Sequence, residues 1–535
     1  MSTSYRIGNR GTSSSSSEST ILKSLLELRS SSSDDDNSSI TFLNCKWSPR
    51  IVQSLRKLLV RDGRFFSTIK FFDCDFNNND DDTNTNTYFA EILNMILAHN
   101  VTRSLIIKGR NGNDGEEVTT ACESSLRSSS LDVSILTALR EGISINTSLK
   151  SLRLSISSGL NVSSSTTDVE DDDDTSQWWQ AFIINTTLTD LDLSGSYLSQ
   201  STVTGLSNAL SLNTFLQSLN LSRCHLNDQF ISEIVRCIQE HPTLTKLNLS
   251  RNYLAKSTNT LAVDAITDLL RSSHDDNNNS KRVLTSLDLS YQQQPLKRIP
   301  KAEEEEEENQ TLRRQQAMAF ANALDALSTN TTLQIINLSG NIGCFADIRN
   351  VKTLSSCLIS NTNLCSVDIS CCDIDTTTNG GIQYLAKHCI PHCSDRLKSL
   401  ILFNDDDGSN NNNNDDNDYI NLEKSTIEVL ATGLQSNTTL VNLGETTSSS
   451  NKTSYCVIQH LLNINRGGRR ALRSNDNLPL AAWSYVLARA GNIEYDDDDT
   501  MDVDSSSTSS TAAVEATSAS VLFELLRGPA LLERN

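Results

Sequence analysis

One short string, L-x-x-L-x-L, recurs along this 535-residue chain and constrains its fold more than any other feature. The clearest copies begin at Leu149, Leu188, Leu216, Leu244 and Leu284. Looser copies begin at Leu333, Leu364 and Leu397, and a truncated copy at Leu440 has Glu445 where the third apolar residue belongs. Leu188, Leu216 and Leu244 follow one another at intervals of 28 residues. Such a period predicts a stack of similar units, because no unit of this size can bury its apolar stripe alone.

Each unit reads as a strand followed by a helix. The last two apolar residues of the string alternate with polar ones, which predicts a short strand with one buried face. Further along, Ile231, Ile234, Val235 and Ile238 have helical spacing. Three weaker copies precede the clear ones, at Ile40/Leu43/Cys45, Ile69/Phe72/Cys74 and Leu105/Ile107. We therefore expect about twelve units.

Two polar positions recur in the units, one at a turn and one at the end of a helix. Eight residues after the first leucine, a turn position is occupied by Cys224, Asn252, Asn341 and Cys372. Three residues before the first leucine, the expected helix end carries Asn146, Asn185, Asn213, Asn330, Asn361 and Asn437. Asparagine tolerates the left-handed conformation that often ends helices, so we interpret these residues as caps. Several also read N-x-[ST], but recurrence at a structural position favours capping over glycosylation.

The 28-residue period and the core L-x-x-L-x-L-x-x-[NC]-x-L resemble the leucine-rich-repeat family, in particular its ribonuclease-inhibitor-like subclass. The match is strongest over residues 149–375. The resemblance implies an α/β solenoid, a horseshoe of about twelve repeats with parallel strands on the concave face and helices on the convex face. The segments N-R-G-G-R-R, L-P-L-A-A-W and L-L-R-G-P-A-L-L resemble the ends of repeat proteins from diatom-type algae, which implies no activity.

The pattern divides the chain into a solenoid and flanking segments. Residues 1–39 are rich in Ser and Asp and predict a disordered tail with a short helix at 20–29, which either caps the first repeat or docks onto a partner. Residues 40–463 form the solenoid, with polar and acidic insertions between units. Residues 464–490 predict a C-terminal cap around Trp483, Val486 and Leu487. Residues 491–519 read as an acidic linker, and 520–535 as a short terminal helix.

Charge and hydropathy exclude several classes of protein. The chain has 45 Lys and Arg against 66 Asp and Glu, a net charge of −21, which argues against nucleic acid as a partner. The acidic runs lack the alternating pattern of calcium loops and read as solvated loops. No apolar run is long enough to span a membrane. The polar N-terminus and the odd number of cysteines, 13, predict an intracellular protein of the cytoplasm or nucleus.

Motifs for catalysis or cofactor binding are missing from the sequence. It contains no P-loop, G-x-S-x-G, G-x-G-x-x-G or H-E-x-x-H string, so we expect neither an enzyme nor a cofactor. The densest set of possible metal ligands is H-C-I-P-H-C, His388 to Cys393, with Cys371 and Cys372 one repeat element upstream. These residue types suit zinc, but the spacing is not the usual C-x₂-C. We predict free or buried thiols there and no metal site.

The positions between the strand leucines are where partner specificity is expected. Asp190 and Lys246 stand at the second residue after the first leucine. The fourth residue is Arg153, Asp192, Asn220, Asn248, Asp288, Asn337 or Asp368. We hypothesise that this exposed ladder contacts a basic or polar surface on an unidentified protein partner. The alternative is that it is hydrophilic filler.

Repeats without catalytic motifs favour a non-catalytic scaffold for protein–protein interaction. One alternative is a regulator of an enzyme, such as a Ran-type GTPase-activating protein, for which Arg110 is the candidate stimulating arginine. Another is an innate-sensing receptor, which would normally add a nucleotide-binding domain.

Overall fold

A computed structural model describes the parts of the chain that carry the repeats. The described residues are 3–8, 18–30, 38–43, 45, 47–74, 84–109, 133–155, 173–254, 260–271, 284–292, 318, 320–341, 344–372, 374–375, 380–403, 424–444, 458–459, 461–463 and 465–466. The predicted linker and terminal helix, nearly all of the predicted C-terminal cap, and Arg110 lie outside them. None of the described helices is both long and apolar enough to cross a membrane.

The chain divides into two compact units. Unit 1 comprises Met1–Leu269 with Asp275–Leu296, and unit 2 comprises Leu270–His274 with Lys297–Asn535. Strands and helices alternate along both, so the fold is α/β, with thirteen strands following one another in sequence order in the sheet. Within each unit, neighbouring described strands pair in parallel. A parallel sheet in sequence order is what stacked strand–helix units produce.

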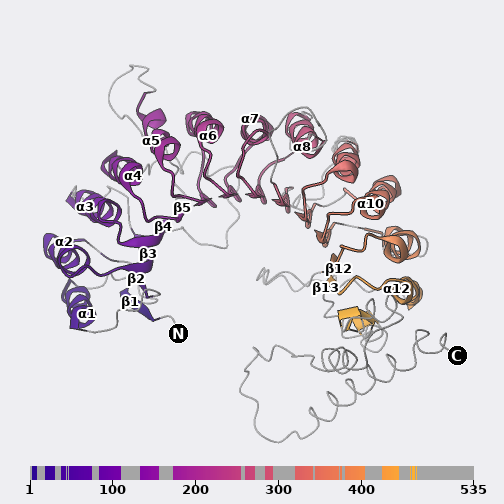
Figure 1. Ribbon diagram of the computed structural model, residues 1–535, viewed down its shortest axis with the longest axis horizontal. Coiled ribbons are helices and arrows are strands. Elements are labelled where there is room, and N and C mark those ends of the chain that lie inside the picture. The colour runs from indigo at the N-terminus through magenta and orange to yellow at the C-terminus, as the bar shows by residue number, and fades with distance from the viewer. Residues whose placement is uncertain are drawn as a thin grey trace, which may run out of the picture. The chain divides into compact units, whose positions relative to one another are not determined.

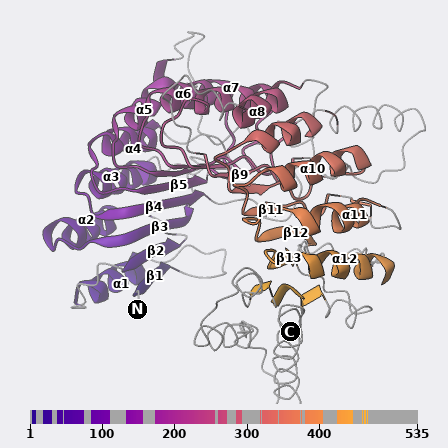
Figure 2. The same ribbon diagram turned by 45° about the vertical axis from the view of Figure 1, so that its right-hand side comes forward.

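Unit 1 holds nine strands, and its helices lie along one face of them (Figures 1 and 2). The strands are β1 (Ser4–Gly8), β2 (Ser39–Leu43), β3 (Phe66–Cys74), β4 (Thr102–Gly109), β5 (Ser151–Ser155), β6 (Asp190–Asp192), β7 (Ser218–Asn220), β8 (Lys246–Asn248) and β9 (Ser286–Asp288). The helices are α1 (Glu18–Ser30), α2 (Pro49–Arg56) continued by the π-turn η1 (Lys57–Arg61), α3 (Asn84–Ala98), α4 (Val133–Ile145), α5 (Asp173–Ile184), α6 (Gln200–Leu212), α7 (Asp228–Ile238) and α8 (Leu261–Arg271).

Unit 2 repeats the same alternation. Its strands are β10 (Ile335–Asn337), β11 (Ser366–Asp368), β12 (Ser399–Phe403) and β13 (Asn442–Gly444). Its helical segments are α10 (Ile348–Ser360), α11 (Gly381–Tyr384) continued by η5 (Leu385–Cys389) and η6 (Ile390–His392), and α12 (Lys424–Ser436). Residues 320–329 are also helical.

The leucines of the repeated string form the core, as predicted. Leu188, Leu191 and Leu193 are each at most 3% exposed, and their apolar counterparts in the later units are at most 8% exposed. The predicted apolar face of α7 is confirmed, since Ile231, Ile234, Val235 and Ile238 are buried. The alternation places the residues between these leucines on the opposite face of the strands.

The register predicted for the first two degenerate copies is wrong. Strand pairing aligns Ile40 and Ile69 with Leu152, which is the second leucine of its string rather than the first. Phe42 and Phe71, rather than Leu43 and Phe72, therefore align with the inward-facing Leu154, and both are at most 1% exposed. The prediction failed because each pair consists of two adjacent apolar residues, and only pairing with a neighbouring strand decides which one faces inward.

The N-terminal residues also differ from the expected disordered tail. Ser4–Gly8 forms β1, which pairs in parallel with β2 and places Ile7 beside Phe42 in the core. The expected helix at 20–29 lies within α1, whose Ile21, Leu25 and Leu28 are buried. The described residues therefore form thirteen strands, one more than the twelve units expected from the sequence. The sequence did not predict this strand, because Tyr5 and Ile7 among polar residues are too short an alternating pattern.

A cluster of aromatic side chains occupies the core of the degenerate units. Phe42 stacks on Phe71 with ring centroids 5.1 Å apart, and Trp47 and Phe89 complete the cluster. These large rings fill the interior where the leucine string is lost, because burial depends on apolar area rather than on residue identity.

Each helix-end asparagine connects two consecutive repeats. The Asn185 Oδ1 accepts hydrogen bonds from the backbone N–H groups of Thr187 (2.9 Å) and Leu188 (2.7 Å). Its Nδ2 donates to the carbonyl oxygens of Ile143 (2.7 Å) and Asn146 (3.0 Å) in the preceding repeat. The other five predicted asparagines repeat this pattern of two accepted backbone bonds and donation to an earlier carbonyl, and all six are buried. We call these contacts the asparagine bridges.

The expected left-handed conformation is wrong for these asparagines. Asn213 and Asn361, the caps of α6 and α10, have extended backbones with φ of −74° and −75°. None of the six has a positive φ, although Asn100, which follows α3, does. Asparagine is needed at the bridge for its side chain, which supplies an acceptor and two donors at once.

One bridge position carries histidine instead. His241 is 5% exposed, and its Nδ1 accepts from the N–H groups of Leu244 (3.1 Å) and Thr243 (3.4 Å). An Nδ1 that accepts must be unprotonated, so we assign the single ring proton to Nε2, which has no hydrogen-bond partner. Burial lowers the pKa of this imidazole.

We predict that Asn185→Ala lowers the free energy of unfolding by about 2–4 kcal/mol, because it leaves buried N–H and C=O groups without partners. Urea unfolding followed through the buried Trp178 and Trp179 of α5 measures this loss. Asn208→Ala, at an exposed position of α6, is the matched control and is expected to stay within about 0.5 kcal/mol of wild type. Equal losses in both variants would contradict the bridge.

We predict that His241 makes stability depend on pH. Its pKa is lowered by folding, so the unfolded chain binds the extra proton and stability falls as pH drops below the unfolded value of about 6.5. Between pH 7.5 and 5.5, wild type should lose up to about 1.4 kcal/mol more than His241→Asn, which restores an amide bridge. The extended backbone of the other bridges is compatible with Pro242 following. His392→Asn, at an exposed position, is the control. If the stability of wild type and of His241→Asn changed equally with pH, the assigned role of His241 would be wrong.

Candidate functional site

The predicted ladder residues do come together along the polar face of the sheet, the face opposite the helices. In unit 1, pairing places Arg153, Asp192, Asn220, Asn248 and Asp288 side by side, and in unit 2 it places Asn337 beside Asp368. We call these residues the polar row. Asp190 and Lys246 belong to a second row two residues earlier, with Ser218 between them.

Most of the polar row is engaged by its own backbone. The Oδ1 of each Asp or Asn accepts from the N–H of the serine two residues later, at 2.9–3.1 Å in Asp192, Asn220, Asn248, Asp288, Asn337 and Asp368. In Asp368, Oδ1 also accepts from the hydroxyl of Ser370 at 2.8 Å. These contacts are Asx turns that close the end of each strand. The residue type is therefore explained by the fold before any partner is considered.

Exposure separates the predicted residues into two groups. The six Asp and Asn of the polar row are half-buried, whereas Arg153, Asp190 and Lys246 are exposed. The Asp and Asn residues are thus less exposed than the expected ladder, and the Oδ1 of each accepts a hydrogen bond from the backbone. Arg153, Asp190 and Lys246 are the predicted residues with side chains accessible to a partner.

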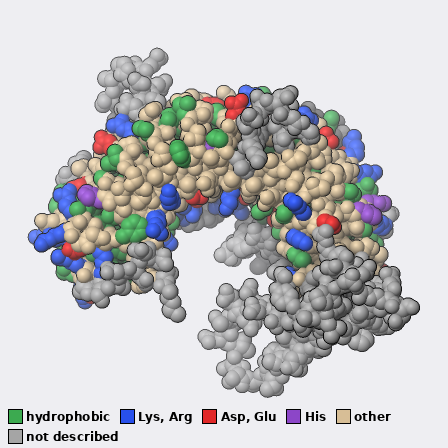
Figure 3. All heavy atoms as spheres, in the orientation of Figure 1, with side chains coloured by type: hydrophobic (Ala, Val, Ile, Leu, Met, Phe, Trp, Pro, Cys, Tyr) green, Lys and Arg blue, Asp and Glu red, His purple; other side chains and the backbone are tan. Residues whose placement is uncertain are grey.

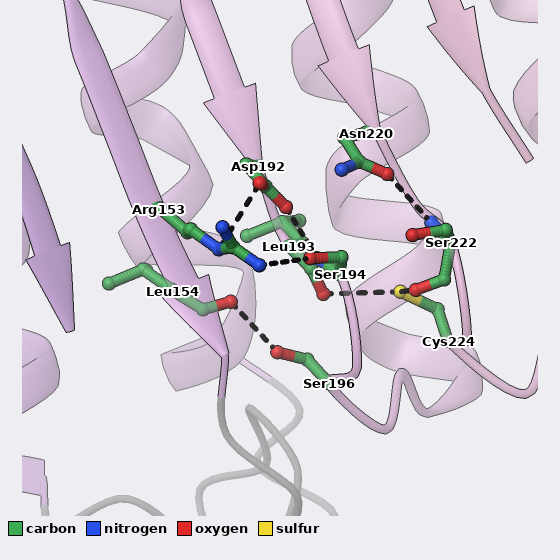
Figure 4. A network of polar contacts seen from close by, with 9 residues as sticks. All are labelled: Arg153, Leu154, Asp192, Leu193, Ser194, Ser196, Asn220, Ser222 and Cys224. Atoms are coloured by element: carbon green, nitrogen blue, oxygen red, sulfur yellow. Dashed lines mark hydrogen bonds and ion pairs between the residues drawn. The ribbon is translucent and has the colours of Figure 1, made fainter. Parts of the chain in front are cut away.

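Arg153 and Asp192 form an ion pair on this face, with Nε and Oδ2 3.3 Å apart (Figure 4). Arg153 Nη2 also donates to Ser194 Oγ at 3.4 Å. Both side chains are partly exposed, so the pair contributes at most about 1 kcal/mol to stability. It orients the guanidinium along the sheet rather than anchoring the fold.

Toward the N-terminal end of unit 1 the same row becomes basic. Pairing continues it from Arg153 through Ile106, Lys70 and Thr41 to Arg6. Lys70 was not predicted because its repeat was placed in the wrong register, and Arg6 was not predicted because its segment was expected to be a disordered tail. The described acidic side chains are scattered over the face shown in Figure 3 rather than gathered in one patch.

A third set of polar residues occupies the turn position beneath the strand ends. Cys224 Sγ donates to the carbonyl of Leu193 at 3.2 Å, and Ser196 Oγ donates to Leu154 at 3.0 Å (Figure 4). Asn252 Nδ2 donates to Leu221 at 2.8 Å. Cys372, Asn341, Cys45 and Gln292 occupy the same position, and their side chains donate to strand-end carbonyls. Ser196 and Gln292 were not predicted, because the repeat pattern has Asn or Cys at this turn position.

The turn cysteines are unsuited to nucleophilic chemistry. Burial raises the pKa of Cys45 and Cys224 to about 12, so each remains a neutral thiol that donates to a carbonyl. The same cause raises the pKa of Cys344 and Cys357 to about 12. We assign these side chains a packing role.

The H-C-I-P-H-C segment is split between two environments. Cys389 and Cys393 are buried, whereas His388 and His392 are exposed. Burial raises the pKa of both thiols, and the His388 ring packs on Tyr384 with centroids 4.6 Å apart. Within the described part of the chain, no three His, Cys, Asp or Glu residues are grouped so as to hold a metal ion.

Comparison with known proteins adds little. No family model matches the sequence, and no curated protein matches it. Among solved structures, "Leiomodin-1 Actin-Binding Site 2 (ABS2)" matches with 17% sequence identity over 36% of this chain and 90% of that chain, at a TM-score of 0.22. A likeness this weak carries no argument about fold or function.

We predict that Asp192→Ala lowers the free energy of unfolding by about 1 kcal/mol, because Ser194 N–H loses its acceptor. Asp192→Asn keeps the acceptor and should stay within about 0.5 kcal/mol of wild type, as should Asp190→Ala at the exposed neighbouring position. Urea unfolding of the three variants measures the difference. A loss in Asp192→Asn as large as in Asp192→Ala would assign the effect to the charge rather than to the turn.

Proposed function

We propose that this chain is a leucine-rich-repeat protein of the ribonuclease-inhibitor-like class and serves as a non-catalytic scaffold for protein–protein interaction. The observation that carries the proposal is the polar face of the sheet. Parallel sheets are usually covered on both faces. Here the described helices line one face of the strands, and the other face exposes Arg153, Asp190 and Lys246.

The chemistry of this face favours charge-steered recognition. Asp190 and Lys246 stand in one row with Ser218 between them, and Ser151 and Ser286 continue this row on either side. All three serines are half-buried. Such a surface favours polar, partly hydrated contacts and fast association. The proposed partner is a protein with polar and charged groups.

The proposed location is the cytoplasm or nucleus. The support comes from the turn thiols, since Cys45, Cys224 and Cys372 act as S–H donors in the core. A reduced thiol at a structural position suits a reducing compartment.

We predict that charge reversal on the polar face removes bound proteins. The test variant is Arg153→Glu, Asp190→Lys and Lys246→Glu, and the control makes the same charge changes at exposed positions on the helical side, Arg236→Glu, Glu240→Lys and Arg271→Glu. Quantitative mass spectrometry of proteins co-purified with the full-length chain measures the result. Loss in the face variant alone supports the scaffold, and equal recovery from all three baits would contradict use of this face.

A further inference from the structure

The backbone just beyond each strand favours glycine. Seven residues after the first leucine, φ is positive: +75° at Gly195 and +68° at Gly340. Arg223, Arg251 and Tyr291 occupy the same position with φ of +56°, +57° and +53°. The left-handed conformation is sterically unfavourable for residues with a Cβ. Three consecutive repeats thus place Arg or Tyr where the backbone conformation favours glycine. A function of the side chain would account for this choice.

These side chains gather with aromatic residues two positions further along. The His225 ring lies 6.3 Å from Tyr197 and 5.6 Å from Tyr253 between centroids, and its Nδ1 is 3.0 Å from the Tyr253 hydroxyl. The Arg251 guanidinium lies over the Tyr291 ring, 4.6 Å from its centroid. We call Tyr197, Arg223, His225, Arg251, Tyr253 and Tyr291 the aromatic–arginine edge.

The edge is accessible and rigid. Tyr197 is 48% exposed, Arg223, His225 and Arg251 are exposed, and Tyr253 and Tyr291 are half-buried. Directly between these positions, the buried turn side chains Cys224 and Asn252 fasten the backbone to the preceding strand. Side chains held in place before binding lose less entropy when a partner docks. Tyr and Arg are also the residue types that most often anchor protein interfaces.

Charge at the edge is opposite to that of the chain. The segments 194–197, 222–225, 250–253 and 290–292 contain two arginines and no Asp or Glu, in a protein of net charge −21. An anionic ligand is therefore complementary to this edge.

We propose that the aromatic–arginine edge docks an acidic, extended segment of a protein partner. Its carboxylates pair with Arg223 and Arg251, and its apolar side chains pack on the rings of Tyr197 and Tyr253. Single-stranded RNA could also stack on such rings, but two cations on a strongly acidic protein neutralise too few phosphates. The proposal rests on the scaffold function and names its partner chemistry.

Fluorescence anisotropy with synthetic probes of about twelve units tests this edge: a peptide alternating Glu or Asp with Leu and Pro, the same peptide with Lys for the acids, and oligouridine. We expect the acidic peptide to bind the full-length chain at least about ten-fold more tightly than either other probe, and more weakly at 0.3 M than at 0.05 M salt.

The decisive variant is Arg223→Gly with Arg251→Gly, because glycine suits both backbones. We expect affinity for the acidic peptide to fall about ten-fold while the melting temperature stays equal or rises. Arg236→Ala with Arg271→Ala is the control and should bind as wild type. Tyr197→Ala with Tyr253→Ala should also weaken binding.

Three outcomes would overturn the proposal: unchanged affinity in the glycine variant, tighter binding of oligouridine than of the acidic peptide, or a lowered melting temperature with unchanged binding. The last would assign the arginines a structural role. Peptide binding is measured without any cellular partner, so its loss in the glycine variant stands even if the polar-face variant retains every co-purified protein. That combination would reject the polar face and keep the edge.

Discussion

The asparagine bridges are the interaction on which the packing of successive repeats depends. At the six bridges, a helix ends beside the next strand, and the asparagine there is buried. A single amide such as Asn185 satisfies groups from two repeats at once, donating to Ile143 and accepting from Leu188. Leucine burial supplies a non-directional driving force. The bridges add direction, since they hold each helix end at one position relative to the following strand.

The need to satisfy buried backbone groups also explains most polar residues around the strand ends. The Asx turns of the polar row and the turn side chains such as Cys224 satisfy backbone groups that a tight repeat would otherwise leave buried. Residue types that suggest a binding ladder in the sequence are largely committed to the fold. The exposed side chains proposed for recognition are Arg153, Asp190 and Lys246 on the sheet face and the two arginines at the edge.

The register of the first repeats shows where sequence reasoning stops. Phe71 and Phe72 are equally apolar, and both fit a strand with one buried face. The choice between them comes from the parallel pairing that aligns Phe71 with Ile107. The corrected register also explains Cys45, which occupies the turn position and donates to Ile7. It further reveals Arg6 and Lys70 as members of the row that contains Arg153.

The sequence by itself determined the strand–helix alternation, the buried leucines and the recurring asparagines, because these follow from periods that are local along the chain. It did not determine the geometry of the asparagines, the acceptor role of His241 or the meeting of Tyr197, His225 and Tyr253. Tyr197, His225 and Tyr253 stand 28 positions apart and become neighbours only when their strands pair. Hydrogen-bond direction and cross-repeat contact are properties of packed backbones, and only the tertiary structure decided them.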